Sequence, residues 1–358
     1  MKVCWLSNYF SPYKIELFKK LSKSIDLTAF MLGGKDENRN NEWKIDEINE
    51  FKLVYIDKDF NKKIKKIAKE NDILIDSMYS TKYGLIAVSE FKKLNKITIM
   101  QADGGIAKNR GFLLNKALSF LMNRHDYFLS SSIFTDKYFE YYGVKKSKIL
   151  HYRFTSLANK DINNNRLLVN KKVELRNKLN INDNFTLISV GQPIKRKGFD
   201  ILLNAYIKTG LMDKINLYII GGEPQEEIKQ IVDINKLENV HFIGLIGSNE
   251  LKEYYAASDA FVLCTREDIW GLVIEEALSF GLPVITSDNC VAGLHFNKLS
   301  ECVEISEVND IDEYAKKIVD LYNDKKLLNK LSKEALDVIK EYTIENSAND
   351  IIEQLNNI

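Results

Sequence analysis

The chain has 358 residues, enough for two ordinary domains and too many for one compact core. Hydrophobic residues make up 45% of it and charged residues 28%, a composition that is typical of globular proteins and excludes a disordered chain. The net charge of +1 hides an uneven distribution, because residues 1–160 carry 29 Lys and Arg against 18 Asp and Glu, and residues 161–358 carry 22 against 32.

Short apolar runs alternate with helical patterns along the first half. We predict strands at Val3–Leu6, Leu27–Leu32, Leu53–Ile56, Ile73–Ile75, Ile97–Met100 and Tyr127–Leu129. We predict helices at Ile15–Leu21, Ile64–Ala68, Leu85–Leu94 and Phe112–Leu121. The polar stretch Asn159–Arg166, rich in Asn and Asp, is predicted to be a linker.

The second half repeats this alternation. The expected strands are Leu187–Val190, Leu217–Ile220, Val240–Ile243, Ala260–Leu263, Val284–Thr286 and Cys302–Ile305, with helical patterns between them. Such alternation predicts an α/β fold with doubly wound parallel sheets and crossover helices. Two such sheets joined by a linker predict two Rossmann-like domains that face each other across a cleft.

Other classes of protein are disfavoured. No run of about 18 apolar residues is present, and the first apolar run turns polar at Ser7, so we expect a cytoplasmic chain without a membrane span or signal peptide. The four cysteines and four histidines form no CxxC, HxxxH or HExxH pair, so we expect neither disulfides nor a metal site. No GxGxxG follows a strand, which disfavours a dehydrogenase, and no basic stripe with stacking aromatics indicates a nucleic-acid binder.

Chemistry is expected after the strands of the second half, because ligands bind beyond the carboxyl ends of parallel strands. The segment Glu267–Pro283 (EDIWGLVIEEALSFGLP) begins in such a loop, and a helix is expected to start near Gly271. The first amides of a helix and its dipole favour an anion, so this is a candidate phosphate site. Glu275 suits the paired hydroxyls of a ribose and Glu267 suits sugar hydroxyls; the alternative is two solvated glutamates near a helix start.

Two earlier loops have related features. Ser189–Gly198 (SVGQPIKRKG) is a strand end followed by a basic loop, and Ile219–Pro224 (IIGGEP) is a strand end followed by two glycines. The ammonium of Lys197 suits a cluster of phosphate oxygens. Without its neighbours, the basic stretch is better explained as a solvated turn.

Taken in order, these motifs resemble the retaining GT-B glycosyltransferase family numbered 4, in particular its bacterial surface-polysaccharide members. The resemblance rests on Glu267-x7-Glu275 followed by EALSFGLPVITSD, and it is strong over about 185–295. It implies an acceptor-binding domain at 1–160 and a nucleotide-sugar-binding domain at 161–341. It also implies a C-terminal helix, about 342–358, that packs back on the first domain.

The resemblance also implies roles for single residues. Glu267 would contact the donor sugar, Lys197 would clamp the donor phosphates and Glu275 would hold the ribose. Many family members have Arg where Gln192 stands, so Arg196 is expected to take over that second clamp. The other implied donor-binding positions are Gln192, Gly221, Gly222, Leu245, Ile269, Trp270, Gly271 and Leu272.

The family often has a histidine after the strand that ends near Met100, where this chain has Gln101 and Asp103. Asp103, on a loop with Gly104 and Gly105, is therefore a third catalytic candidate that would orient the reacting sugar or the acceptor. The alternative is an ordinary glycine-rich turn that contains an aspartate.

The implied activity is that of a retaining hexosyltransferase that needs no metal or other cofactor. The donor would be a nucleotide-sugar, with UDP favoured over GDP, and the acceptor an undecaprenyl-diphosphate-linked oligosaccharide at the inner leaflet. Two basic segments, Asn61–Lys69 and Arg110–Arg124, are predicted to dock on anionic lipid. The alternative is that their apolar faces lie in the core, which we slightly favour for the second segment.

Two other functions fit the sequence less well. A metal-dependent GT-A transferase would use Asp57 and Asp59, which form a DxD after a strand, but the motifs of the second half have no place in that fold. A non-catalytic GT-B-like partner subunit would not need Glu267, Lys197 and Glu275, all of which are present.

Overall fold

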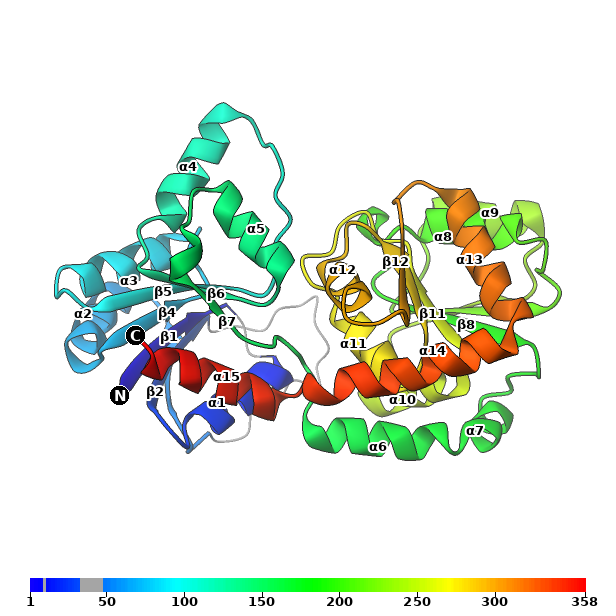
Figure 1. The fold of residues 1–358 in the computed structure, drawn as a ribbon, viewed down its shortest axis with the longest axis horizontal. Helices are drawn as coiled ribbons and strands as arrows, with labels where there is room; N and C mark the ends of the chain where they lie inside the picture. Colours follow the sequence, from blue (N-terminus) through cyan, green and yellow to red (C-terminus); the bar gives the residue numbers. More distant parts are fainter. Residues whose placement is uncertain (9–10, 33–47) are drawn as a thin grey trace. The chain divides into compact units, whose positions relative to one another are not determined.

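The computed structural model describes residues 1–8, 11–32 and 48–358. These residues form two compact units, one of residues 1–156 with 343–358 and one of residues 157–342 (Figure 1). Within the described part of the chain, no helix has the length and apolar character needed to cross a lipid bilayer.

The first unit is built on a seven-stranded sheet in the order β3-β2-β1-β4-β5-β6-β7, with every neighbouring pair parallel. Its strands are β1 (Lys2–Ser7), β2 (Asp26–Leu32), β3 (Lys52–Ile56), β4 (Ile73–Asp76), β5 (Ile97–Ala102), β6 (Tyr127–Ser130) and β7 (Ile149–His151). Its helices are α1 (Pro12–Leu21), α2 (Phe60–Glu70), α3 (Lys82–Lys92), α4 (Phe112–Met122), α5 (Ile133–Tyr141) and α15 (Ile344–Asn356), with a 3-10 turn, η1, at Lys146–Lys148.

Side chains alternate between the two faces of β1. Cys4 and Leu6 join a buried cluster with Phe60 of α2 and Phe91 of α3, whereas Trp5 packs its ring 5.2 Å from that of Phe18 on α1. Helix α15 lies beside α1 on that second face (Figure 1). Because both faces are covered by helices, the strands are apolar along their length, which explains why they were predictable as continuous runs.

The second unit is built on a six-stranded parallel sheet in the order β10-β9-β8-β11-β12-β13. Its strands are β8 (Phe185–Val190), β9 (Ile215–Ile220), β10 (Val240–Ile243), β11 (Ala260–Leu263), β12 (Val284–Ser287) and β13 (Val303–Ser306). Its helices are α6 (Asn159–Val169), α7 (Lys172–Lys178), α8 (Phe199–Lys208), α9 (Glu226–Asn235), α10 (Ser248–Ala257), α11 (Leu272–Ser279), α12 (Val291–Asn297), α13 (Ile311–Asn323) and α14 (Lys325–Val338), with 3-10 turns η2 (Lys195–Lys197) and η3 (Ile339–Glu341).

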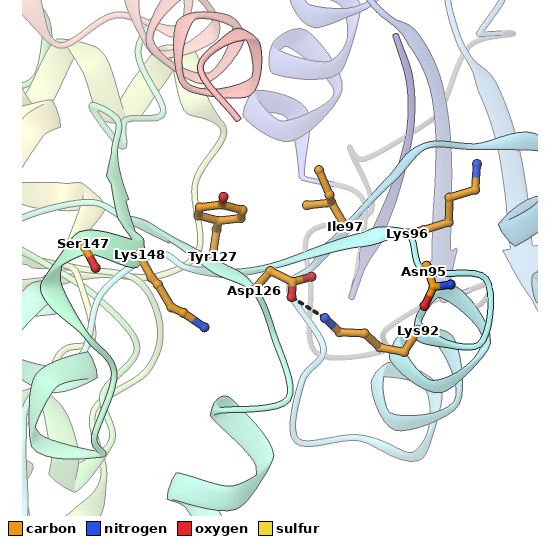
Figure 2. A pocket seen from close by; sticks show the side chains of 8 residues that line it. All are labelled: Lys92, Asn95, Lys96, Ile97, Asp126, Tyr127, Ser147 and Lys148. Atoms are coloured by element: carbon orange, nitrogen blue, oxygen red, sulfur yellow. Dashed lines mark hydrogen bonds and ion pairs between the residues drawn. The ribbon is translucent and has the colours of Figure 1, made fainter.

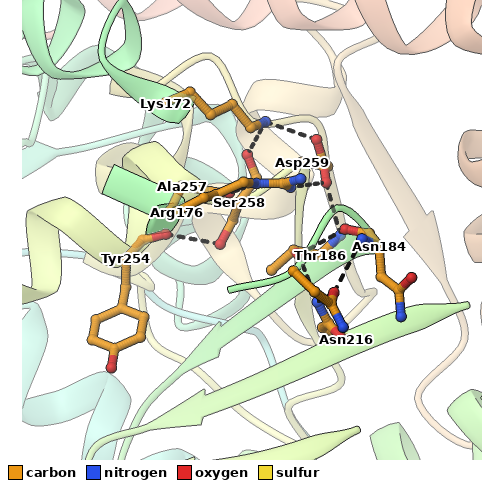
Figure 3. Close-up of polar contacts among 10 residues, drawn as sticks. Lys172, Arg176, Asn184, Thr186, Asn216, Tyr254, Ala257, Ser258 and Asp259 are labelled. Atoms are coloured by element: carbon orange, nitrogen blue, oxygen red, sulfur yellow. Dashed lines mark hydrogen bonds and ion pairs between the residues drawn. The ribbon is translucent and has the colours of Figure 1, made fainter. Parts of the chain in front are cut away.

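A network of ion pairs and hydrogen bonds stabilises the amino-terminal edge of this second sheet (Figure 3). Asp259, just before β11, receives ion pairs from Lys172 at 2.7 Å and Arg176 at 2.6 Å, and it also accepts the amide of Thr186 at 2.7 Å. Desolvation by burial lowers the pKa of Lys172, although the negative charge of Asp259 acts to raise it. These charges hold α7 against the sheet at the edge away from the strand carboxyl ends, so they have a structural role.

The predicted α/β architecture with two doubly wound parallel sheets is confirmed, and each predicted strand overlaps an observed one. The predicted linker at Asn159–Arg166 is wrong, because these residues form most of α6. The helix is held by tertiary contacts: the amide of Asn165 donates to Ser279 Oγ at 2.8 Å, and Arg166 donates to the carbonyl of Leu336 at 3.0 Å. Polar composition thus indicated a loop where packing imposes a helix.

Candidate active site

The candidate site lies where the strand order of the second sheet reverses. Strand β8 has β9 on one side and β11 on the other, so the loops that follow β8 and β11 leave the sheet at a topological switch point. In open parallel sheets this is where ligands bind. The loop after β8 carries Gln192, Arg196 and Lys197, and the loop after β11 carries Glu267 to Gly271.

The two loops touch at Gly198. Its backbone φ of 70° lies in the left-handed region, and a Cβ atom there would stand 1.9 Å from the carbonyl oxygen of Cys264. Any larger residue would force the loops apart, so glycine is required by both conformation and space. The loop after β9 also lies close to the loop after β8, since a Cβ on Gly221 would lie 2.5 Å from the carbonyl oxygen of Gly191.

Hydrogen bonds then join the loops after β8 and β11. The carbonyl of Arg196 accepts the amide of Arg266 at 2.8 Å and the hydroxyl of Thr265 at 3.0 Å. The guanidinium of Arg266 binds Asp200 through two bonds of 2.8 and 2.6 Å and also donates to the carbonyl of Lys195. The side-chain bond to Arg266 lowers the pKa of Asp200, which keeps this clamp charged.

The two basic candidates make contacts across the loops. Arg196 donates to the carbonyl of Glu267 at 2.6 Å, and the ammonium of Lys197 lies 2.6 Å from the carboxylate of Asp268. The structure therefore brings Arg196 against the backbone of Glu267 and Lys197 against the side chain of Asp268. Sequence reasoning assigned no role to Asp268, because its partner is 71 residues away and no local spacing signals the pair.

The helix expected near Gly271 is α11. Gly271 is its N-cap with a φ of 103°, and a Cβ there would lie 2.7 Å from Cys290 Sγ. A glycine offers no side-chain acceptor to the first amides of the helix, and of these the amide of Ile274 donates to the carbonyl of Gly271 at 2.9 Å. The dipole of α11 favours an anion at this end. Trp270 is buried, whereas Ile269 is exposed at the surface of the loop. Leu272 is half-buried as the first residue of the helix.

Glu275 is fully buried rather than solvated. Its Oε1 accepts the indole N–H of Trp270 at 2.8 Å. The Trp270 ring lies 5.7 Å from that of His295, whose Nε2 is 2.6 Å from the hydroxyl of Tyr342. Burial lowers the pKa of His295 to about 4, so the ring is neutral at physiological pH. The alternative of two solvated glutamates is thus wrong for Glu275, and Glu267 is half-buried.

The remaining donor candidates surround these loops. Gly222 has a φ of 143°, and a Cβ there would lie 3.0 Å from the ring of Pro193. Gln192 is exposed on the loop after β8. Leu245 follows β10 and is also exposed, as an apolar residue beside the same carboxyl edge of the sheet.

In the first unit, a chain of side-chain hydrogen bonds gathers at the carboxyl edge of the sheet. The buried amide of Gln101 at the end of β5 donates to Asp103 at 2.6 Å and to the hydroxyl of Tyr152 at 2.5 Å. Its carbonyl accepts the hydroxyl of Ser77 at 2.5 Å, and that hydroxyl accepts the indole of Trp5 at 2.9 Å. Asp103 is therefore fixed by Gln101. The sequence suggested both residues but not this network.

The two basic segments of the first unit differ in structure. In α2 the apolar residues Phe60, Ile64, Ile67 and Ala68 are buried, so that face belongs to the core. In α4, by contrast, Phe112, Leu113, Leu114 and Phe120 are 78%, 81%, 49% and 68% exposed. The preference for a core role of Arg110–Arg124 is confirmed only for Met122 and Leu118, which pack in the core, and is wrong for the four exposed residues. The sequence pattern shows an apolar face but not whether another element covers it.

The two aspartates of the DxD alternative, Asp57 and Asp59, make local contacts. Asp57 pairs with Lys63 at 2.6 Å and accepts the backbone amide of Asp59, so the two aspartates form a turn before α2. In the described ranges, no group of three or more His, Cys, Asp and Glu side chains is placed to hold a metal ion. The two-sheet fold also rules out the GT-A architecture that this alternative required.

A pocket of about 650 Å³ lies at the opposite edge of the first sheet (Figure 2). It is lined by Lys92, Asn95, Lys96, Ile97, Asp126, Tyr127, Ser147 and Lys148. Ile97 and Tyr127 are the first residues of β5 and β6, so this is the amino-terminal edge. Lys92 pairs with Asp126, which also accepts the amide of Thr98 at 2.9 Å. The ion pair of Lys92 and Asp126 stabilises the first residues of these strands. The pocket is separate from the carboxyl ends of the strands, where ligands of parallel sheets bind.

Two doubly wound parallel-sheet units of this kind define the GT-B fold. The crystal structure of Anabaena Alr3699/HepE in complex with UDP is similar over 100% of both chains, with a TM-score of 0.80. The two sequences are 16% identical, so this likeness concerns the fold.

Residues 171–338 match the model of the family described as Glycosyl transferases group 1. An uncharacterized glycosyltransferase of Haemophilus influenzae is 32% identical over 176 residues, 48% of each chain. The O-antigen biosynthesis glycosyltransferase WclY of Escherichia coli is 31% identical over 186 residues, 49% of this chain and 51% of WclY. The chain thus spans about half the length of the curated relatives it matches.

Proposed function

We propose that the protein transfers a sugar from a UDP-sugar to a lipid-linked saccharide during the synthesis of a surface polysaccharide. The observation that carries this proposal is the pair of joined loops at the switch point of β8 and β11, which brings Lys197, Arg196 and the start of α11 together. The resemblance to WclY and the UDP and UDP-glucose complexes of HepE support the polysaccharide context and the choice of UDP.

The reaction would break the bond between the sugar and the donor diphosphate. Positive charge develops on the sugar and negative charge on the leaving phosphate, and an enzyme gains most by stabilising that charge. Lys197, Arg196 and the first amides of α11 provide cations and N–H donors for the leaving phosphate, so this mechanism requires no metal. Glu275 would hold the ribose by exchanging or sharing its bond with Trp270.

We infer that transfer retains the configuration at the sugar carbon, with the acceptor attacking on the face that the diphosphate leaves. The leaving phosphate would help to deprotonate the acceptor hydroxyl. Glu267 would position the donor sugar and would not form a covalent intermediate. Asp103, held by Gln101, would orient the acceptor or the reacting sugar.

The acceptor proposal also uses the surface of α4. Its outward apolar residues lie in a stretch, 104–125, with four basic residues and no acidic one: Lys108, Arg110, Lys116 and Arg124. Insertion of such a face into an anionic bilayer combines burial of apolar area with attraction to lipid phosphates. A peripheral position at the inner leaflet would bring the first unit to an undecaprenyl-diphosphate-linked oligosaccharide.

The donor proposal is tested by thermal shift with a panel of nucleotides, followed by hydrolysis of the matching nucleotide-sugars. Stabilisation by UDP and slow hydrolysis of a UDP-sugar are expected. The variant Glu267→Gln should keep UDP binding but lose most of the hydrolysis. A near-normal rate in that variant contradicts the role of Glu267, and a chain that binds no nucleotide contradicts the proposed function.

A further inference from the structure

Asp268 follows the proposed sugar-binding Glu267 and forms a close ion pair with Lys197. Its Oδ2 is 2.6 Å from Lys197 Nζ, and its Oδ1 is 3.9 Å from the guanidinium of Arg196. The side chains of Lys197 and Asp268 are only 12% and 15% exposed, so solvent screens this pair weakly. A carboxylate thus stands inside the cluster of cations that would receive the donor diphosphate.

The carboxylate is held on a fixed stretch of backbone. The amide of Asp268 donates to the carbonyl of Asn289 at 2.8 Å, and its own carbonyl accepts the amide of Val291 at 3.3 Å. These bonds form a parallel bridge with Cys290 beside the end of β12. The stem of Lys197 lies against Gly191, where a Cβ would be 3.3 Å from Lys197 Cε. The lysine is therefore confined at both its stem and its head.

This geometry orients the remaining donors of Lys197. An ammonium group has three N–H donors, and Asp268 takes one of them. The other two are then directed away from Asp268 before any ligand binds. A flexible lysine would otherwise lose side-chain freedom at the moment of binding, so Asp268 prepares the group that would stabilise the leaving phosphate.

The same carboxylate repels negative charge, and the repulsion differs between donor and product. A terminal phosphate carries a charge of about −1.5 to −2 at neutral pH, whereas a phosphate esterified to a sugar has lost that second ionisation. Asp268 therefore opposes the nucleoside diphosphate product more than the nucleotide-sugar donor. We propose that Asp268 is a positioning residue that holds Lys197 ready for the leaving phosphate and speeds release of the product. This inference rests on the proposed UDP-sugar transferase function.

Two substitutions separate position from charge. Asp268→Asn keeps the size of the side chain but removes its charge, and Asp268→Glu keeps the charge but moves it. A matched control is Glu253→Gln, which neutralises a carboxylate that is also 2.6 Å from a lysine, Lys178, but lies between α7 and α10. The dissociation constants of UDP and UDP-glucose are measured by calorimetry for each protein, together with donor turnover and inhibition by UDP.

In Asp268→Asn, UDP should bind about threefold to tenfold more tightly relative to UDP-glucose than in the unaltered protein. Turnover should fall about tenfold or more, with stronger inhibition by UDP, because a misplaced group near the reaction centre costs rate. Asp268→Glu should also lose turnover but keep the original ratio of the two affinities. Glu253→Gln should match the unaltered protein in every measurement.

The outcomes distinguish this inference from the function on which it rests. If the unaltered protein binds neither UDP nor UDP-glucose, the proposed function is wrong. If it binds both but Asp268→Asn leaves their affinity ratio unchanged, or shifts it toward UDP-glucose, then Asp268 does not discriminate donor from product. If Asp268→Asn keeps full turnover, the positioning of Lys197 by Asp268 is not needed.

Discussion

The indole nitrogen of Trp270 donates a 2.8 Å hydrogen bond to the buried carboxylate of Glu275, five residues further along the chain. The bond spans the start of α11, because Trp270 precedes the N-cap Gly271 and Glu275 lies in the first turn. A carboxylate removed from water needs such donors, and here the donor comes from the loop that would bind the donor diphosphate. The conformation of this loop is therefore linked to the position of Glu275, the residue proposed to bind the ribose.

Replacement of Trp270 by Phe should weaken the second unit. Phenylalanine keeps a six-membered aromatic ring but lacks the pyrrole ring and its N–H. The loss of the hydrogen bond to a buried carboxylate alone should lower the free energy of unfolding by about 1 to 3 kcal/mol. Chemical denaturation measures this value. UDP binding should weaken as well, since Glu275 loses a contact that fixes its orientation.

A matched control for this substitution is Trp5→Phe in the first unit. The indole of Trp5 donates a 2.9 Å bond to a neutral acceptor, the hydroxyl of Ser77. Because a neutral bond contributes less than one to a charged group, its loss should cost only about 0.5 to 1.5 kcal/mol. Equal losses for the two variants, with unchanged UDP binding in Trp270→Phe, contradict a special role for the Trp270 bond.

Local pattern was sufficient for the elements that carry the candidate site. Buried strands such as β8 and β11 are continuous apolar runs. Gly198 marks a loop whose backbone lies close to that of Cys264, and Gly271 marks a loop that lies close to the side chain of Cys290. The positions of Arg196, Lys197 and Glu267 followed from the loops after those strands. What the pattern could not supply was the partner of each charge, because Lys197 and Asp268 are 71 residues apart.

The errors have a related physical origin. Asn159–Arg166 looked like a linker because its residues are polar, yet α6 is fixed by contacts with residues more than a hundred positions away. The periodicity of Phe112–Leu121 showed an amphipathic helix, but only the tertiary structure shows that no described element covers its outer face. Both cases depend on long-range packing. In α6 tertiary contacts stabilise a helix in a polar segment, and in α4 no described element buries the outer apolar residues.

The exposed face of α4 predicts binding to anionic membranes. The double variant Phe112→Ser/Phe120→Ser should lose about tenfold or more of the affinity for anionic vesicles, because each phenylalanine gives up apolar area that would be buried in lipid. Flotation with vesicles of phosphatidylglycerol and phosphatidylcholine measures this binding, and higher salt should weaken it.

The control for this surface is Ile234→Ser on α9. Ile234 is 78% exposed, like the residues of α4, but α9 begins with two glutamates, Glu226 and Glu227, and belongs to the second unit. This variant should bind vesicles as the unaltered protein does. Failure of the unaltered protein to bind anionic vesicles at low salt excludes α4 as a membrane-docking surface.

The bond between Gln101 and Asp103 predicts that the two residues act together. Gln101→Leu removes the donor that fixes Asp103, and Asp103→Asn changes the group itself. Each variant should lower turnover by up to about a hundredfold, while the dissociation constant for UDP stays unchanged because both residues belong to the first unit. Steady-state rates and calorimetry separate these two quantities.

The double variant tests the coupling of Gln101 and Asp103. If Gln101 acts only through Asp103, the rate of the double variant should be close to that of the slower single variant. Losses that multiply show that the two residues work independently. A full rate in Asp103→Asn removes Asp103 from the catalytic candidates.

The buried ring of His295 predicts a loss of stability in acid. Burial lowers its pKa from 6.5 to about 4, so between these values the unfolded chain binds a proton that the folded chain does not. The contribution of the neutral His295 ring to the free energy of unfolding is then fully present above about pH 6.5 and is lost as the pH falls toward about 4. Between about pH 7 and about pH 4.5, the unaltered protein should lose on the order of 2 kcal/mol more of its free energy of unfolding than His295→Gln, in which this titration is absent. Denaturant unfolding at several pH values gives the difference, and parallel curves for the two proteins show that the ring is protonated in the folded state at its ordinary pKa.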